Sequence, residues 1–385
     1  MRIVSVTPLQ CSNGWATWTF VRIESDDSHV GYGECSDWQM ANALAGGIHD
    51  LGEVIIGKDP RRVQALTADM TFHLRQNVGG VGQKALAGIE AALWDLKGQA
   101  HATSITDLLG GATRDRIRLY WSHCGSYRIR YPKLLGTPPI NSWSDLSILG
   151  KEVVSRGYTA LKTNPFLPGD PQHFHFAQPT DGNLERNDLR VIVRQIETLR
   201  EAVGQEVDIC LDLNFRFRPS AVISIAEALR PYELLWIEYD SYDRDALSYI
   251  RQSITTPLCS GENLVTMSDY NRFFHSGSMD IAMVDVAWNG ISQSIRIAEL
   301  ASNHEIQVAP HNYYSHISTF MCAHMAAVVT NLRIMETDVD SAPWRDELVT
   351  VTPTIKDGWL YPPNEPGLGT ALDEDALSGH PPRST

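Results

Sequence analysis

Hydrophobic and polar residues alternate over much of the first 35 positions of the chain, as in residues 17–24. This alternation is typical of strands in an antiparallel sheet that has one solvated face. Between residues 43 and 109 the spacing of apolar residues becomes helical, and residues 83–99 carry them at i, i+3 and i+4 positions. We therefore predict a small α+β domain over residues 1–115.

Two loops interrupt the predicted sheet, near residues 12–18 and 36–45, and each contains a tryptophan among small or polar residues. Loops of this kind can close over a binding site, although a tryptophan in a loop is more often a packing anchor. We expect the two loops to act as lids, with Trp15 and Trp38 closing over a bound substrate.

Short apolar runs alternate with amphipathic helical stretches through residues 116–336. A strand followed by a helix at such a repeat is a parallel βα unit. Eight strands are expected, centred near residues 119, 161, 210, 236, 259, 283, 308 and 334. The predicted fold is α/β, a modified TIM barrel of the (β/α)7β type with the N-terminal α+β domain as a cap. The proline-rich residues 337–385 are expected to return to this capping domain.

Three consecutive apolar runs of the predicted barrel end in a carboxylate, at Asp212, Glu238 and Glu262, spaced 26 and 24 residues apart. Right-handed crossovers bring these three strand ends to one rim of the sheet. Carboxylates that meet there repel one another unless a cation lies between them. Oxygen ligands alone favour Mg²⁺, or Mn²⁺ in its place. One such acid needs no ion to explain it, but three in regular succession favour a metal site.

The overall charge and the cysteines narrow the range of partners. A net charge of −14 without a basic stripe argues against a nucleic-acid partner. A small anionic substrate is still allowed, because a local cation can reverse the field inside a cleft. The six cysteines are scattered without C-x-x-C spacing, and no membrane span or signal peptide is expected. We therefore expect a cytoplasmic protein with no membrane partner.

Several short motifs follow one another in a fixed order along the chain. They are G-I-E-A-A-L-W-D-L-K-G at 88–98, L-D-L-N at 211–214, W-I-E at 236–238, S-G-E-N at 260–263, V-D-V-A-W-N-G at 284–290, A-P-H-N at 309–312 and M-E at 335–336. With this set the sequence resembles the enolase superfamily, and within it the mandelate racemase-like branch of acid-sugar dehydratases. The resemblance covers essentially the whole chain, and the ordered set is far more specific than any single motif.

This resemblance implies a role for each acidic residue and histidine at the end of a barrel strand in these motifs. The three carboxylates would bind one Mg²⁺, which holds the substrate carboxylate and stabilises an enediolate as a Lewis acid. His311 would remove the proton α to that carboxylate, and Asp285 would hold the imidazole and raise its basicity. Glu336 would donate a hydrogen bond to the developing oxyanion, which requires it to be protonated or to share a proton.

The second barrel strand departs from the mandelate racemase pattern. That pattern is K-x-K, with both lysines on one strand face, whereas this chain has Lys162 and Asn164. Lys162 can still act electrostatically on the substrate carboxylate, but Asn164 cannot be a base. A racemase with a base on each side of the carbanion is therefore disfavoured, and removal of one α proton with loss of a β-hydroxyl is favoured.

The sequence does not decide which residue is the acid that protonates the departing hydroxyl. Galactonate- and mannonate-type dehydratases carry a histidine two residues after the first metal ligand, where this chain has Asn214. His311 itself can return its proton in a syn elimination, or His123 or Tyr313 can supply one. His123 is equally suited to binding a substrate hydroxyl.

We predict a Mg²⁺-dependent dehydratase that converts a sugar acid, an aldonate or aldarate, to a 2-keto-3-deoxy acid. The alternatives are an epimerase or cycloisomerase on the same site, and a non-catalytic family member that binds a ligand. The resemblance also implies a homo-oligomer, either a dimer or an octamer. The predicted substrate-binding residues are Asn164, Asn214, His123, Trp15 and Tyr313.

Overall fold

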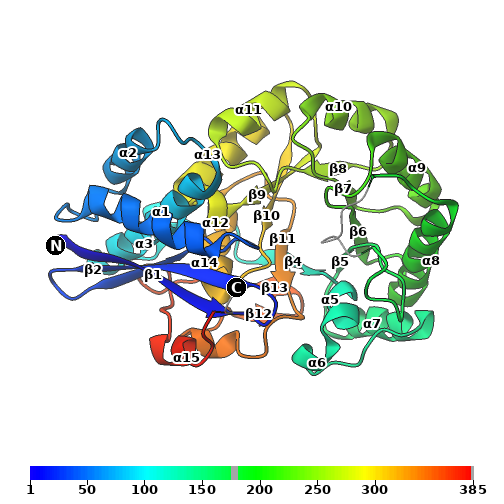
Figure 1. Ribbon diagram of the computed structural model, residues 1–385, viewed down its shortest axis with the longest axis horizontal. Coiled ribbons are helices and arrows are strands. Elements are labelled where there is room, and N and C mark those ends of the chain that lie inside the picture. The colour runs from blue at the N-terminus through cyan, green and yellow to red at the C-terminus, as the bar shows by residue number, and fades with distance from the viewer. Residues whose placement is uncertain (175–180, 383–385) are drawn as a thin grey trace.

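The computed structural model describes residues 1–174 and 181–382, and it shows a small N-terminal domain beside a larger barrel (Figure 1). The small domain begins with an antiparallel sheet of β1 (Ile3–Ser12), β2 (Thr17–Ser25) and β3 (Val30–Glu34), paired in that order. Its helices are α1 (Ala41–Ile55), α2 (Val63–His73), α3 (Gly80–Ala100) and α4 (Ile105–Leu108). The prediction of an antiparallel start followed by helices is confirmed.

Helix α3 lies directly against β3 because two glycines of that strand leave room for it. A Cβ on Gly33 would lie 2.1 Å from the carbonyl oxygen of Gly88, and one on Gly31 would lie 2.4 Å from that of Ala92. Real Cβ atoms do not make contacts this short, so glycine is required for the two backbones to approach so closely.

The larger domain is a barrel of eight parallel strands, counted over the described residues. The strands are β4 (Ile117–Ser122), β5 (Ala160–Thr163), β6 (Asp208–Asp212), β7 (Trp236–Glu238), β8 (Leu258–Ser260), β9 (Ile281–Asp285), β10 (Gln307–His311) and β11 (Met335–Asp338). They pair in order from β4 to β10, and β11 pairs with β4. An isolated parallel bridge between Val308 and Leu332 links β10 to the segment before β11 and so joins the two ends of the sheet.

Helices follow each of the first seven barrel strands and surround the sheet (Figure 1). They are α5 (Ser126–Arg130), α6 (Pro132–Leu135), α7 (Trp143–Ser155), α8 (Arg186–Val203), α9 (Pro219–Leu229), α10 (Arg244–Ser253), α11 (Met267–His275), α12 (Val286–Asn289), α13 (Ile291–Ser302) and α14 (His316–Val328). This arrangement is the predicted (β/α)7β barrel. None of the helices in residues 1–174 and 181–382 is both long enough and apolar enough to cross a membrane.

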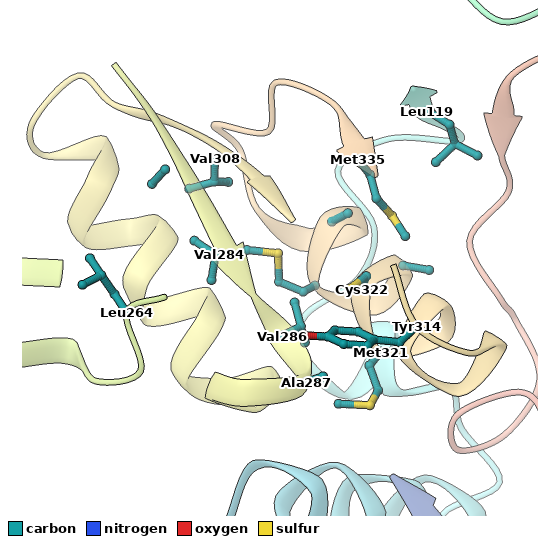
Figure 2. Packing of buried hydrophobic residues seen from close by; sticks show 14 of the residues in the cluster. Leu119, Leu264, Val284, Val286, Ala287, Val308, Tyr314, Met321, Cys322 and Met335 are labelled. Atoms are coloured by element: carbon teal, nitrogen blue, oxygen red, sulfur yellow. The ribbon is translucent and has the colours of Figure 1, made fainter. Parts of the chain in front are cut away.

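Two apolar clusters hold the barrel together. One fills the interior with side chains from the strands: Tyr120, Ala160, Cys210, Trp236, Cys259, Ile281, Met283, Ala309 and Ile334. The other lies between the strands and the outer helices and continues into the capping domain, and Figure 2 shows Val284 and Val308 in it together with Met321 and Cys322 of α14. Because side chains fill the interior, a ligand can bind only at an end of the barrel.

The C-terminal segment contacts both domains. A short hairpin of β12 (Ile355–Lys356) and β13 (Trp359–Leu360) pairs antiparallel with β4, and so it extends the barrel sheet. Further on, Glu374 in α15 (Glu374–Ser378) forms an ion pair with Arg22 of β2 at 2.9 Å. The expected return to the capping domain therefore describes only part of this segment, since strands of two residues are too short to leave a pattern in the sequence.

Glu90 of α3 fixes the capping domain to the barrel. Its carboxylate accepts hydrogen bonds from the backbone N–H groups of Ile291 at 2.8 Å and Ser292 at 3.0 Å, at the first residues of α13. The N-terminal N–H groups of a helix have no partner within the helix, so a carboxylate placed there is well satisfied. This contact holds the two domains in a defined orientation around the strand ends.

His324 of α14 gives the fold a testable pH dependence. Burial lowers the pKa of His324 to about 4, and it outweighs the hydrogen bond between Nε2 and the carbonyl oxygen of Leu368 at 3.0 Å, which raises the pKa. Nδ1 accepts a hydrogen bond from the backbone N–H of Thr106 at 3.2 Å, as the neutral ring can. Between the unfolded and folded pKa values, the unfolded chain binds a proton that the folded chain does not, so stability falls as the pH falls. Between about pH 7 and about pH 4.5, the free energy of unfolding of wild type is expected to fall by about 2 kcal/mol more than that of His324→Gln. Urea titrations at both pH values measure this, with the exposed His49→Gln as control; equal losses in wild type and His324→Gln would contradict it.

Candidate active site

The carboxyl ends of the barrel strands surround a cavity of about 380 Å³. Parallel strands end at one rim, so residues that are far apart in the sequence meet there. Trp38 of the capping domain also reaches this cavity. Eight of the predicted site residues line it: His123, Lys162, Asn164, Asp212, Asn214, Glu262, His311 and Tyr313.

Three carboxylates form a cluster at this rim. One oxygen each from Glu238, Asp240 and Glu262 lies within 4.8 Å of the others. Burial raises the pKa of Glu238 and of Glu262 well above their usual range, and neighbouring carboxylates raise both further against the charge of Lys162. Burial likewise raises the pKa of Asp240 to about 6, and its Oδ2 has no hydrogen-bond partner among the described residues. The cluster therefore favours a positive charge between its oxygens.

The sequence prediction for this cluster named Asp212 and missed Asp240. A signal was available, because Asp240 follows Glu238 by two residues and positions i and i+2 of an extended chain share a face. Asp212 lies nearby, and its charge adds to the raised pKa that burial gives Glu238. Among the described residues, the group whose ligand oxygens lie within 4.8 Å of one another does not include Asp212. Its role as a metal ligand stays a prediction.

Asn164 and Asn214 orient the carboxylate of Asp212. The Nδ2 atoms of Asn164 and Asn214 donate to Oδ2 of Asp212 at 2.9 and 3.0 Å, and the backbone N–H of Asn214 donates to Oδ1 at 2.7 Å. Asn214 has a φ of 50°, in the left-handed region that asparagine tolerates better than most residues. Both side chains line the cavity, and substrate binding by them stays a prediction.

His311 and Asp285 form a hydrogen-bonded pair at the ends of the neighbouring strands β10 and β9, where they are in register. Nδ1 of His311 donates to Oδ2 of Asp285 at 2.7 Å, and the same oxygen accepts a hydrogen bond from the hydroxyl of Tyr314 at 2.6 Å. The other ring nitrogen, Nε2, lies 3.2 Å from Oε2 of Glu262 at the cavity. Burial lowers the pKa of His311, but Glu336 and Asp285 outweigh it and the net pKa is raised. The sequence analysis did not find Tyr314, which orients Asp285.

Lys162 lies between two buried carboxylates. Its Nζ is 3.1 Å from Oε2 of Glu238 and 3.0 Å from Oε1 of Glu336. Burial lowers the pKa of Lys162, but these two carboxylates raise it well above its usual value, so the ammonium stays charged. Burial raises the pKa of Glu336, yet Lys162, His311 and His123 outweigh burial, and the net pKa lies far below the usual range.

The role predicted for Glu336, donation of a hydrogen bond to an oxyanion, requires a proton that these surroundings disfavour, and it stays a prediction. Its surroundings favour the ionised form, which can only accept. Oε1 accepts from the hydroxyl of Ser122 at 2.5 Å, and Oε2 accepts from the backbone N–H of Asn312 at 2.7 Å. Glu336 is thus an acceptor that holds Lys162 in place.

The two loop tryptophans differ in position. Trp15 stacks on Tyr131 with ring centroids 4.9 Å apart, and it lies 5.0 Å from the ring of Tyr127. It does not line the cavity, whereas Trp38 and Tyr127 do. In this structure Trp15 packs behind Tyr127, and contact between Trp15 and substrate stays a prediction.

Two further predicted residues lie at the cavity. The ring of Tyr313 is 5.0 Å from that of His311, and burial raises the pKa of Tyr313 well above its usual value. Nδ1 of His123 is 2.8 Å from Oδ1 of Asp338. Asp338 was not predicted, although it follows Glu336 by two residues.

Two family models match the chain. The model described as mandelate racemase / muconate lactonizing enzyme, N-terminal domain, matches residues 3–110, and the model described as enolase C-terminal domain-like matches residues 147–376. Together they include both the capping domain and nearly all of the strands that form the cavity.

Individual relatives also resemble the chain over most of its length. It is 29% identical to a D-galactonate dehydratase of Pectobacterium atrosepticum, covering 94% of this chain and 90% of that protein. It is 27% identical to a D-gluconate dehydratase of Thermoproteus tenax, covering 94% of this chain and 70% of that protein. A crystal structure from Burkholderia xenovorans strain LB400, provisionally named an L-alanine-DL-glutamate epimerase and bound to magnesium and fumarate, has a TM-score of 0.94 and 36% identity, covering 100% of this chain and 97% of that one.

Proposed function

Because the chain belongs to the mandelate racemase/muconate lactonizing enzyme family of the enolase superfamily, we propose that it dehydrates a sugar acid. The substrate is an aldonate or an aldarate, and the product is a 2-keto-3-deoxy acid. The relatives named as D-galactonate and D-gluconate dehydratases support this reaction class. The observation that carries the proposal is the His311–Asp285 pair, whose Nε2 lies at the same cavity as the carboxylate cluster.

Different residues of this chain have different roles in the proposed reaction. Nε2 of His311 accepts the proton from the carbon next to the substrate carboxylate, and Asp285 stabilises the imidazolium that forms. The electron pair of that C–H bond becomes a carbon–carbon double bond, and the β C–O bond breaks as its oxygen gains a proton and leaves as water. The enol product then becomes the 2-keto acid. Lys162, which stays charged between its two carboxylates, stabilises negative charge on the substrate carboxylate.

The carboxylate cluster fits a hard divalent cation. Three carboxylate oxygens lie within 4.8 Å of one another, and Oδ2 of Asp240 has no partner among the described residues. Oxygen ligands of this kind suit Mg²⁺ or Mn²⁺. When bound, such an ion polarises the substrate carboxylate and so makes its α proton more acidic. We propose Glu238, Asp240 and Glu262 as the residues that hold it, with Asp212 next to them.

Asp240→Asn is expected to weaken binding of Mg²⁺ at least about tenfold, because it removes a negative charge from the cluster and replaces an oxygen that has no other partner. Isothermal titration of the purified protein with MgCl₂ measures this without any substrate. Asp245→Asn makes the same chemical change at an exposed position and is expected to bind Mg²⁺ as wild type does. Equal affinities for wild type and Asp240→Asn would remove Asp240 from the site.

Epimerisation of an acid is the second candidate function, and the provisional name of the Burkholderia structure favours it. That reaction needs a second base on the opposite side of the carbanion. On β5, Asn164 cannot accept a proton, and Lys162 stays protonated between Glu238 and Glu336. Dehydration needs one base only and is therefore the better supported reaction.

A panel of aldonates and aldarates, beginning with D-galactonate and D-gluconate, tests the proposal. Each is incubated with the protein and Mg²⁺, 2-keto acids are detected with semicarbazide, and exchange of the α proton is followed by NMR in D₂O. Formation of a 2-keto-3-deoxy acid supports dehydration. Exchange without 2-keto acid would favour an epimerase or cycloisomerase, and no reaction with any acid would favour a protein that only binds its ligand.

A further inference from the structure

A second histidine–aspartate pair lies at the same cavity. Asp338 ends β11 and is in register with Ser122 of β4, next to His123. Nδ1 of His123 donates to Oδ1 of Asp338 at 2.8 Å, much as Nδ1 of His311 donates to Asp285 at 2.7 Å. The side chain of Asp338 is fully buried, and both imidazoles line the cavity. Strands β4 and β11 are neighbours in the barrel, so the pair is built into the sheet.

The ring of His123 is held in one orientation. It stacks on Tyr127 with centroids 4.2 Å apart and an angle of 6° between the planes, and Ser122 Oγ lies 3.2 Å from Nδ1. The backbone of His123 has a φ of 47°, in the left-handed region, which costs a residue with a Cβ about 1 kcal/mol or more. Among the described residues none bonds to its Nε2, so that nitrogen is the one that remains for a ligand in the cavity.

We propose that His123 is the general acid that protonates the departing β-hydroxyl, an inference that rests on the proposed dehydration. His311 takes the α proton, the C–H electron pair forms the carbon–carbon double bond, and the C–O electron pair stays on the oxygen. That oxygen takes the proton from Nε2 of His123 and leaves as water. His123 regains a proton from solvent, and Asp338 stabilises its charged form.

The other candidates for this acid are less suited. Burial raises the pKa of Tyr313 well above its usual value, so its hydroxyl gives up a proton poorly. His311 can return its own proton only if the hydroxyl leaves from the side on which the α proton was removed. His123 adds a proton donor from a different strand end, and its ring is oriented by a carboxylate as a general acid requires.

The leaving group gives the test. His123→Gln is compared with wild type on the sugar acid identified in the panel and on its analogue with fluorine in place of the β-hydroxyl, since fluoride leaves without a proton. Turnover of the hydroxyl substrate is expected to fall about 10²- to 10⁴-fold, while fluoride release and α-proton exchange in D₂O stay within a few-fold of wild type. Asp338→Asn, at a positioning residue, is expected to show the same split with a smaller loss.

His29→Gln provides the matched control, because His29 pairs with Asp27 at 3.2 Å on the surface and is expected to leave all rates unchanged. Circular dichroism of each variant checks the fold, and Asp338→Asn carries the test if His123→Gln does not fold. Equal loss of hydroxyl turnover, fluoride release and exchange would overturn the proposal, as would full retention of hydroxyl turnover. If wild type neither exchanges nor dehydrates any sugar acid, the proposed function fails first and this assignment falls with it.

Discussion

Replacing His311 with asparagine is expected to lower turnover of the sugar acid by about 10⁴-fold, the upper end for loss of a general base. The imidazole is oriented for this role, since Nδ1 is bound by Asp285 and Nε2 lies at the cavity. Asparagine keeps a side-chain N–H near Asp285 but has no nitrogen that can accept a proton. Both 2-keto acid formation and α-proton exchange in D₂O should therefore be lost together.

Two controls separate this loss from damage to the site. Binding of Mg²⁺ to His311→Asn, measured by titration, is expected to survive because the carboxylate cluster is unchanged. His29→Asn removes a surface histidine and is expected to keep wild-type rates. Retained turnover in His311→Asn would show that another group is the base, and lost Mg²⁺ binding would show that His311 supports the cluster instead.

The contact between His311 and Asp285 could be predicted from the sequence because it follows from regular structure. Each residue ends an apolar run, and the runs are one βα unit apart. In a parallel sheet such positions fall in register on neighbouring strands, as the pairing of β9 and β10 shows. The same argument placed Glu238 and Glu262 together. The regular βα repeat is therefore enough to predict which strand-end residues of the site lie close together.

The parts that the sequence did not reveal depend on irregular structure or on several elements at once. Asp240 lies just past the end of β7, so its spacing of two residues from Glu238 indicates its direction only if the chain stays extended beyond the strand. Trp15 and Trp38 have similar surroundings in the sequence, and only the docking of the capping domain decides that Trp38 reaches the cavity.

The lowered pKa of Glu336 is a further case. It results from positive groups on three other elements, Lys162 on β5, His311 on β10 and His123 after β4, which together outweigh the effect of burial on its pKa. No single motif of the sequence contains that information, because none of the four residues is near another along the chain. The pattern of strand ends predicts which residues meet, and their charges follow only from the distances between them.

Lys162 balances two of the buried carboxylates, and its removal has the largest expected effect on stability. In Lys162→Met the side chain still fills space, but Glu238 and Glu336 lose the ammonium that lies 3.1 and 3.0 Å from them. Removing one partner of a buried ion pair leaves an uncompensated charge, so the free energy of unfolding is expected to fall by about 3 kcal/mol in the presence of EDTA. Urea unfolding followed by fluorescence measures this change.

The matched variants show whether charge is the cause. Lys58→Met breaks an exposed pair with Asp69 and is expected to cost about 1 kcal/mol or less. In the double variant Lys162→Met/Glu238→Gln the unpaired carboxylate is gone as well, so part of the stability should return. Mg²⁺ should stabilise Lys162→Met more than wild type, because a cation in the carboxylate cluster takes over some of the charge that Lys162 balanced. If Lys162→Met unfolds at the wild-type urea concentration in EDTA, or if the double variant is less stable than the single one, Lys162 does not neutralise these acids and the charge balance proposed for the site is wrong.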